Sequence, residues 1–286
     1  MSEFTAGVYT MDDGTYHRDP LRGHGTMSLS VSGSKWLLPP HPPARFKHFL
    51  DHPEDRPSSD AMIEGAAFHS MLLGGRPVED IGTDRLVGDH KAEVVEKQLA
   101  GVLCVKTPVF ERLTAMVDAV RSHEIASMVL KNGKPEQALF TQDKGTGVWL
   151  RAKADWLGDP NDDIVIVGEV KTTSGSAHPL EFGKTTATFG YHRQAAWTID
   201  LVKALKLASK ARFFHVVVEK DPPHLVNVME IHNDHIIRAR KLNKLAIATF
   251  AYCLEHNQWP GYGNKVHSLQ LPTWSVNQDE TILEES

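Results

Sequence analysis

Apolar residues recur along this chain at two different spacings, and the change between them falls near residue 138. Before that point most apolar positions lie three or four residues apart, as on one face of an α-helix. After it, several stretches alternate with period two, as in a β-strand, and two later stretches return to the helical spacing. The pattern predicts helices over residues 44–50, 61–73, 108–120, 125–130, 186–207 and 234–256, and strands over 138–142, 148–157, 164–172, 213–219 and 225–231.

The order of these elements predicts an α/β fold. Helices come first, followed by three strands, a helix, two strands and a helix, which is expected of a central mixed β-sheet flanked by helices with an α-helical N-terminal portion. Residues 1–27 lack periodicity and are expected to form an arm, and residues 263–286 an extended acidic tail. Residues 28–262 would then be a single domain, with a helical part over 28–135 and a sheet core over 136–262.

The strand predicted over 164–172 ends in two opposite charges, Glu169 and Lys171. Because side chains alternate along a strand, these two share one face while Val170 points to the other. Asp155, in the preceding predicted strand, adds a second carboxylate. Carboxylate oxygens bind Mg²⁺ and a lysine can orient or deprotonate a water, so this trio is typical of metal-assisted phosphodiester cleavage.

The Asp/Glu-x-Lys pattern occurs at one other place, Asp89-His-Lys91, which follows no buried run and is interpreted as a solvated segment. By contrast, Glu169 ends a five-residue apolar run of mostly β-branched residues, which is typical of a central strand covered on both faces. An ordinary surface ion pair at the end of a strand remains the alternative interpretation of Glu169 and Lys171.

Composition and charge limit the choice of function. The 286-residue chain has a net charge of −5, which argues against a basic footprint spread over its surface but allows an enclosed basic channel. No apolar run is long enough to cross a membrane, and the N-terminus lacks the pattern of a signal peptide, so a cytoplasmic protein is expected. Cys104 and Cys253 are too few for a cysteine-ligated metal cluster and are interpreted as core residues.

Three further residues are candidates for the same site. His69 lies on the predicted helix 61–73, one turn after Gly65, whose missing Cβ leaves room for a ligand or another backbone. Tyr191 and Gln194 are three residues apart, hence neighbours on the helix that follows the Glu169 strand. A strand-to-helix crossover tends to bring such residues over the strand's carboxyl end. The alternatives are an ordinary helical histidine and an amphipathic helix flank.

Six segments, taken together, resemble the catalytic domain of RecE (exonuclease VIII). They are Gly-Ala-Ala-Phe-His69, Lys-Ala-Asp155, Glu169-Val-Lys-Thr-Thr173, Gly190-Tyr-His-Arg-Gln-Ala-Ala196, Val218-Glu-Lys-Asp-Pro-Pro223 and Trp259-Pro-Gly-Tyr262. That family belongs to the PD-(D/E)XK nuclease superfamily, with lambda exonuclease and the RecB nuclease domain, and the resemblance implies a restriction-endonuclease-like core. It runs in order from about residue 28 to residue 262. At position 169 the chain has Glu where many relatives have Asp.

The resemblance also implies roles for single residues. The implied metal ligands are Asp155, Glu169 and the Val170 carbonyl, with His69 as a ligand to the second metal. The residues implied to position the attacking water or a phosphate are Lys171, Gln194 and Tyr191. Ser30 and Ser32 lie where lambda exonuclease contacts a 5′-phosphate, although Ser30 could equally cap a short helix. The basic candidates for contacting DNA phosphates are Lys35, Arg151, Lys153 and Arg193, with Arg22, Arg45 and Lys47 as further possibilities.

The function implied by the resemblance is a Mg²⁺-dependent 5′→3′ exonuclease that degrades one strand of linear double-stranded DNA and leaves a 3′ overhang for recombination. Two Mg²⁺ ions, replaceable by Mn²⁺, would bind in each active site. The implied partners are a ring of identical subunits and a RecT-like single-strand annealing protein, in the cytoplasm of a bacterial host. The alternatives are a PD-(D/E)XK endonuclease on branched or nicked DNA, a catalytically idle DNA-binding module of this fold, and a non-nuclease α/β protein.

Overall fold

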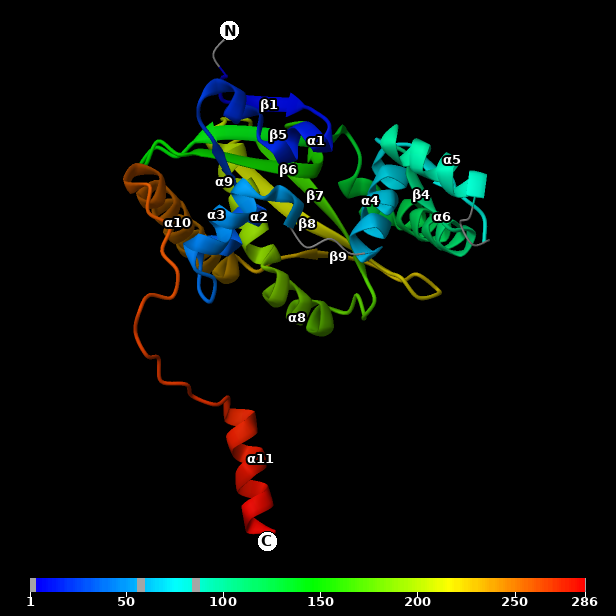
Figure 1. The fold of residues 1–286 in the computed structure, drawn as a ribbon. Helices are drawn as coiled ribbons and strands as arrows, with labels where there is room; N and C mark the ends of the chain where they lie inside the picture. The colour runs from blue at the N-terminus through cyan, green and yellow to red at the C-terminus, as the bar shows by residue number, and fades with distance from the viewer. Residues whose placement is uncertain (1–3, 56–59, 84–87, 286) are drawn as a thin grey trace.

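A computed structural model describes residues 4–55, 60–83 and 88–285 of the chain. At its centre is a mixed, mostly antiparallel sheet of seven of the described strands, in the order β1-β5-β6-β7-β8-β9, with β2 paired to β6 off this path (Figure 1). The strands are β1 (Gly7–Thr10), β2 (Ser28–Ser30), β5 (Gly133–Gln142), β6 (Trp149–Gly158), β7 (Ile164–Thr173), β8 (Lys210–Glu219) and β9 (Val226–Glu230). The predicted α/β class with a sheet core is confirmed.

The predicted turn between β5 and β6 is a hairpin whose register is set by Asp143. Its carboxylate accepts hydrogen bonds from the backbone N–H groups of Gly145 and Thr146, at 3.1 and 2.9 Å. Gly147 adopts φ 72°, a left-handed conformation that glycine reaches at little cost. The two strands then pair from Gln142 opposite Trp149 down to Gly133 opposite Gly158.

Strands β7 and β8 are parallel and are joined by two helices rather than the single helix predicted over 186–207. These are α8 (Pro179–Phe189) and α9 (Tyr191–Ala204), and the break between them is Gly190, which ends α8 with φ 73°. A left-handed residue cannot continue a right-handed helix, so the chain changes direction there. The prediction of one long helix was therefore wrong, and α9 begins at Tyr191.

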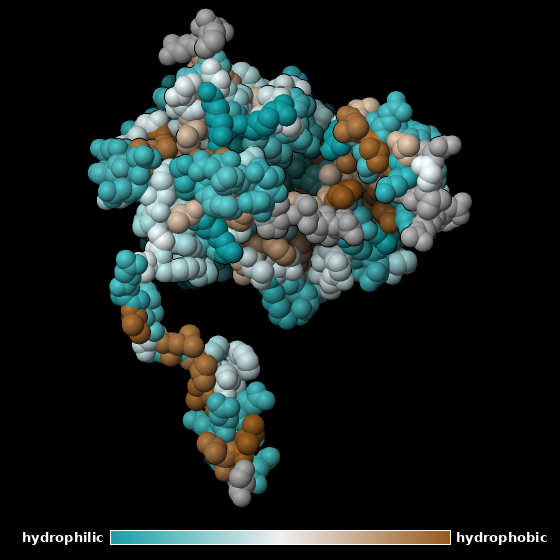
Figure 2. Space-filling model, in the orientation of Figure 1, coloured by the Kyte–Doolittle hydropathy of each residue, from teal (hydrophilic) through white to brown (hydrophobic). Residues whose placement is uncertain are grey.

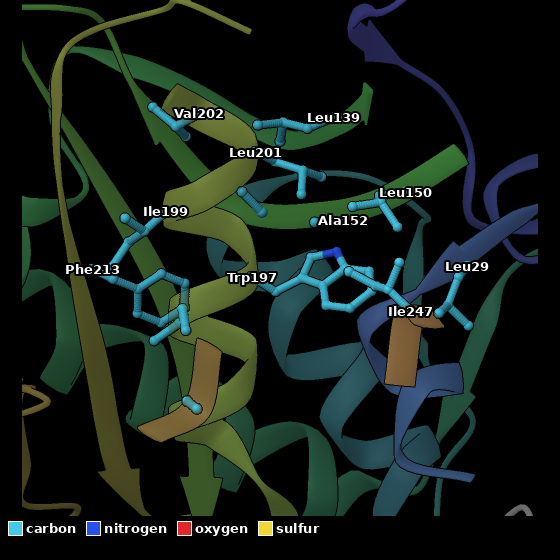
Figure 3. Close-up of a cluster of buried hydrophobic side chains, with 14 of the residues drawn as sticks. Leu29, Leu139, Leu150, Ala152, Trp197, Ile199, Leu201, Val202, Phe213 and Ile247 are labelled. Carbon is cyan, nitrogen blue, oxygen red and sulfur yellow. The ribbon is translucent and has the colours of Figure 1, made fainter. Parts of the chain in front are cut away.

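The two faces of the sheet are covered by different helices. Helices α9 and α10 (Asn233–His256) cover one face, where the Trp197 indole packs beside Leu150 and Ala152 of β6 in the largest buried cluster (Figure 3). Helices α4 (Asp60–Leu73), α6 (Thr107–Ser122) and α7 (Glu124–Val129) cover part of the other face. Strand β7 supplies Val167 to the first cluster and Val170 to the second, as the predicted alternation requires.

The part of the chain that precedes β5 is helical, as predicted, but it also contains strands that the sequence pattern did not indicate. Residues 76–106 hold two short parallel strands and a helix, β3 (Val78–Asp80), α5 (Gly88–Leu99) and β4 (Leu103–Val105). The remaining elements before residue 56 are α1 (Asp13–Arg18), η1 (Pro20–His24), α2 (Val31–Ser34), η2 (Lys35–Leu37), α3 (Pro43–Asp51) and η3 (Pro53–Asp55). The Asp89-His-Lys91 segment lies on α5, outside any strand.

Both ends of the chain depart from the predicted arm and extended tail. Strand β1 pairs with β5 and extends the sheet, and Tyr16 and Leu21 are buried against Phe140. Residues 273–284 form helix α11 (Thr273–Glu284), which stands away from the body in Figure 1 and buries none of its side chains. Figure 2 shows apolar atoms exposed along this terminal segment. No helix in the described part of the chain is long and apolar enough to cross a membrane.

Candidate active site

The site lies where strand β6 changes partners. Its first three residues pair with β2, whereas its last part pairs with β7, at Trp156 opposite Gly168 and Leu157 opposite Val167. Beyond Gly168, β7 continues to Thr173 without β6 pairs and pairs only with β8. The β6 edge of β7 is thus opened over these residues, and its backbone polar groups must find other partners. In Figure 2 the surface is hollowed between the sheet body and the α4–α6 helices.

The gap between β6 and β7, called the fork below, holds the side chains of Asp155 and His69. They supply hydrogen-bond partners for the backbone N–H and carbonyl of Val170. The Asp155 Oδ2 atom accepts a hydrogen bond from the Val170 N–H at 2.8 Å, and the His69 Nε2–H is 3.1 Å from the Val170 carbonyl oxygen. The His69 Nδ1 atom lies 3.5 Å from Asp155 Oδ1. The structure therefore brings together His69, Asp155 and the Val170 carbonyl, three of the four expected metal ligands, from α4, β6 and β7.

Glu136 of β5 joins this group, although the sequence analysis did not select it. Ligand atoms of His69, Glu136 and Asp155 all lie within 4.8 Å of one another. Glu136 adopts φ 56° within β5, a left-handed conformation that costs a non-glycine residue about 1–3 kcal/mol. The pairing of β5 with β6 places Glu136 between Pro135 and Gln137, which face Trp156 and Ala154, and so beside Asp155. The strand predicted from the sequence began only at residue 138, so Glu136 was missed.

The fourth expected ligand, Glu169, faces a different set of groups. It is buried, and its Oε1 atom accepts a 2.6 Å hydrogen bond from the Lys171 ammonium and another from the Gln194 amide. The Lys171 nitrogen also lies 4.9 Å from the centroid of the Tyr191 ring. All four predicted residues thus meet at the N-terminal end of α9, and Glu169 and Lys171 share a face as expected.

The two carboxylates titrate in opposite directions. Burial raises the pKa of Glu169, and the negative charge of Asp155 adds to this, so that the pKa reaches about 7 despite the nearby Lys171. Burial would also raise the pKa of Asp155, but His69 and Lys171 outweigh it and hold that pKa below its ordinary value. For His69, burial is outweighed by the Asp155 carboxylate, and the pKa is raised. The two carboxyls of the site therefore differ in acidity, and Glu169 is protonated more easily than Asp155.

His215 is a second residue that the sequence analysis missed. It lies on β8 directly beside Glu169 in the parallel register, is 1% exposed, and its Nε2 atom has no hydrogen-bond partner among the described residues. Its ring packs among Phe182, Tyr191 and Phe213. Burial, reinforced by the Lys171 charge, lowers the pKa of His215 to about 3, so its ring is neutral and packs against the site as an apolar group would. A histidine between Phe214 and Val216, inside an apolar stretch, was the only sequence signal.

The donor set suits a hard divalent cation. Two carboxylates, a backbone carbonyl and an imidazole can surround an ion with oxygen and nitrogen ligands, as Mg²⁺ and Mn²⁺ sites do. The carboxylates already lie close together at one edge of a broken sheet, and like charges so placed are costly unless a cation or a proton compensates them. The residues present therefore fit a metal centre made by His69, Glu136 and Asp155 with the Val170 carbonyl, next to Glu169.

The remaining predicted site residues fall into two groups. Arg151 is buried, 2.9 Å from Asp19, and donates to the Ser28 carbonyl, while Lys153 is paired with Asp13 and Glu136. Both cations are thus engaged inside the protein, so a contact with a DNA phosphate does not fit their surroundings. Arg151 instead holds Asp19, which precedes β2, and Lys153 holds the Glu136 carboxylate.

Ser30, Ser32, Lys35 and Arg193 lie together on the α2 side of the site. The Ser30 hydroxyl accepts a 3.0 Å hydrogen bond from the Gly33 N–H and caps α2, as one interpretation expected, and it lies 3.2 Å from the Ser32 hydroxyl. Lys35 and Arg193 have no carboxylate partner among the described residues. These two are therefore the predicted phosphate contacts whose charges remain available.

Comparisons with known proteins concern the family and the fold. Residues 30–272 match a family described as "PDDEXK-like domain of unknown function (DUF3799)". A solved structure from Eubacterium rectale, described as a "Putative exonuclease", superposes with a TM-score of 0.62 at 11% identity, over 94% of this chain and 98% of that one. Another solved structure, SSO0001, reaches a TM-score of 0.30 at 12% identity, over 67% of this chain and 84% of that one. No curated protein matches the chain.

Proposed function

Because the chain belongs to the PDDEXK-like domain family DUF3799, we propose that it is a divalent-metal-dependent nuclease. The observation that carries the proposal is the gap between β6 and β7. It gathers Asp155, His69 and Glu136 at the Val170 backbone, and the Glu169–Lys171 pair flanks Val170 in β7. Clustered carboxylates beside a buried lysine are costly to fold and serve no purpose in a protein that only needs a stable sheet.

The protein's own groups divide the work of hydrolysis. His69, Glu136, Asp155 and the Val170 carbonyl would hold Mg²⁺, or Mn²⁺ in its place, and Glu169 would contribute to a second ion. When bound, the metal would polarise the scissile phosphate and stabilise the leaving oxygen. Lys171 orients the attacking water. Its ammonium donates a hydrogen bond to Glu169 and lies over the Tyr191 ring, and Gln194 donates a hydrogen bond that fixes the same Glu169 carboxylate. Tyr191 limits access of bulk water to the ammonium.

We further propose that the substrate is linear duplex DNA, degraded from 5′ to 3′ so that a 3′ overhang remains for recombination. The resemblance to RecE supports this finer assignment, as does the description of the solved structure of the same fold as a "Putative exonuclease". The same resemblance supports a ring of subunits around the DNA and a RecT-like annealing partner. Contacts mainly to phosphates would make cleavage indifferent to sequence.

The test is digestion of a 5′-phosphorylated linear duplex by the purified chain with Mg²⁺, beside closed circular duplex of the same sequence. Linear DNA should release mononucleotides and closed circles should remain intact. Cleavage of closed circles would favour the endonuclease alternative over the exonuclease. If neither DNA is cleaved with Mg²⁺ or with Mn²⁺, the alternative of a catalytically idle DNA-binding module is favoured.

Lys171→Ala should abolish digestion, because the variant loses the ammonium that orients the water. Removing a group that acts at the reacting centre costs about 10²-fold or more in rate. Lys184→Ala is the matched control, since Lys184 is an exposed lysine of α8 paired only with Glu181. Digestion by Lys171→Ala at the control's rate would remove Lys171 from the mechanism.

A further inference from the structure

The aromatic ring of Phe189, the last residue of α8, is open to solvent. It is 61% exposed, whereas every other phenylalanine of the chain is buried or half-buried. The exposed tyrosine and tryptophan side chains of the described residues are Tyr252, Tyr262 and Trp274, which lie near the end of α10 or after it. Phe189 is therefore set apart from these rings by its place in the chain, one residue before Gly190.

Phe189 is connected to the proposed active site through Tyr191. The two rings are stacked, with centroids 5.7 Å apart and planes inclined by 21°, and the Tyr191 ring is also stacked on Phe182, at 5.9 Å and 28°. The Lys171 nitrogen lies 4.9 Å from the Tyr191 centroid. Exposure rises along these three rings, from 3% at Phe182 through half-buried Tyr191 to Phe189. One ring, that of Tyr191, thus separates the exposed Phe189 from the lysine of the site.

The left-handed conformation of Gly190 is what lets the two rings stack. In a continuous helix, residues two positions apart do not face each other. Gly190 has φ 73° and ends α8, so the chain turns between Phe189 and Tyr191 and their side chains come alongside. The break between α8 and α9 therefore places the Phe189 ring at the site instead of on another side of the helix.

The part of α8 around Phe189 suits a flat partner better than a protein surface. The residues that share its side of the helix, three and four positions earlier, are Thr186 and Thr185, and the exposed Leu180 lies at the other end of α8. Protein interfaces have a broader apolar centre, made by several large side chains. A single ring matches the face of a nucleobase. Bases inside a duplex are already stacked on each other, so the base that can reach Phe189 is an unpaired one.

We propose that Phe189 stacks on an unpaired base of the DNA strand that is cut at Lys171, and that the enzyme thereby favours nucleotides already separated from the duplex. The inference rests on the proposed nuclease function and names the part of the substrate that is held. Stacking on an aromatic ring tolerates every base, because each base has a flat face. The contact therefore fits a nuclease that cuts without regard to sequence.

The experiment measures binding of the full chain, in EDTA so that cleavage does not interfere, to a labelled duplex with a short unpaired segment at its 5′ end. A second duplex is identical except that the unpaired nucleotides lack their bases. Phe189→Leu should raise the Kd for the first duplex about fivefold or more, as expected for the loss of stacking on one base, and leave the Kd for the second unchanged. Phe189→Trp should retain wild-type affinity for the first duplex, because an indole also stacks.

The matched control is Leu180→Ala, which removes an apolar side chain of the same helix that is 77% exposed. This variant should bind both duplexes like the wild type. Equal loss of affinity for the two duplexes in Phe189→Leu would show that Phe189 acts through the packing of Tyr191 and not through a base, and would overturn the inference. Self-association of the wild type that Phe189→Leu abolishes would identify a protein contact instead and overturn it as well.

Wild-type affinity of Phe189→Leu for the first duplex, or no binding of either duplex by the wild type, would overturn the inference even if the wild type digests DNA. Base-dependent binding by a chain that digests no DNA with Mg²⁺ or Mn²⁺ would leave the stacking site standing and overturn the nuclease proposal. The two failures are therefore distinguishable.

Discussion

At the scale of single residues, the site depends on backbone groups as much as on side chains. Val170 offers its N–H to Asp155 and its carbonyl to His69 because β6 no longer pairs with this part of β7. Val170, the apolar residue between Glu169 and Lys171, therefore belongs to the site. Its side chain packs into the core on the other face while its main chain organises the site.

Glu136 is expected to bind metal, and Glu136→Gln should raise the Kd for Mn²⁺ about tenfold or more, as measured by calorimetry. Burial and the Asp155 carboxylate raise the pKa of Glu136, although the Lys153 ammonium opposes them. Because the amide carries no charge to bury and Lys153 keeps its pair with Asp13, the fold should stay intact. Glu181→Gln, on exposed α8, is the control. An unchanged Kd would show that Glu136 is not a ligand.

His215 is expected to make the stability of the protein fall in acid. Its pKa is about 3 in the folded protein and near 6.5 in the unfolded chain, so the unfolded state takes up the proton first as the pH falls below 6.5. The resulting loss of unfolding free energy should approach about 3 kcal/mol by pH 4. Urea denaturation of His215→Phe should lack this component, whereas His267→Phe, an exposed control, should retain it. Parallel pH profiles for the wild type and His215→Phe would contradict the argument.

At the scale of elements, the break at Gly190 sets the position of α9. The glycine ends α8 in a left-handed conformation and makes room for Arg193, so α9 can start with Tyr191 and Gln194 directed at Glu169 and Lys171. The spacing of apolar residues alone predicts a continuous helix over residues 186–207 and does not mark the break at Gly190.

Gly190→Ala should therefore lower both stability and activity. A left-handed alanine costs about 1 kcal/mol or more, and the added methyl group meets the Arg193 guanidinium. Gly183→Ala, in the interior of α8 where a Cβ would meet nothing within 4 Å, should instead raise stability by up to about 1 kcal/mol. Urea denaturation and digestion of linear duplex measure both effects. Equal stability of the two variants would mean that the break does not depend on Gly190.

At the scale of the whole molecule, the two ends of the chain contribute unequally to the fold. Strand β1 extends the sheet beside β5, and Phe4 and Tyr9 pack against Phe140. Helix α11 buries no side chain, and it lies beyond residue 272, where the family match ends.

Deletion of residues 273–286 should accordingly leave the thermal unfolding midpoint unchanged. Deletion of residues 1–12 should lower it, by about 2–4 °C for each kcal/mol of lost packing and pairing. Calorimetry of the two truncated chains measures the difference. A lower midpoint after removal of residues 273–286 would show that α11 packs on the body in solution.

The sequence by itself determined the helices and strands with strong periodicity, the Asp155/Glu169/Lys171 pattern and the α9 residues that accompany it, because these follow from local spacing of two or three to four residues. The tertiary structure decided what depends on strand pairing: the fork between β6 and β7, the entry of Glu136, the burial of His215, and the internal ion pairs that withdraw Arg151 and Lys153. Local spacing cannot reveal which strand lies beside which or which charge meets which, since those contacts join residues far apart in the chain.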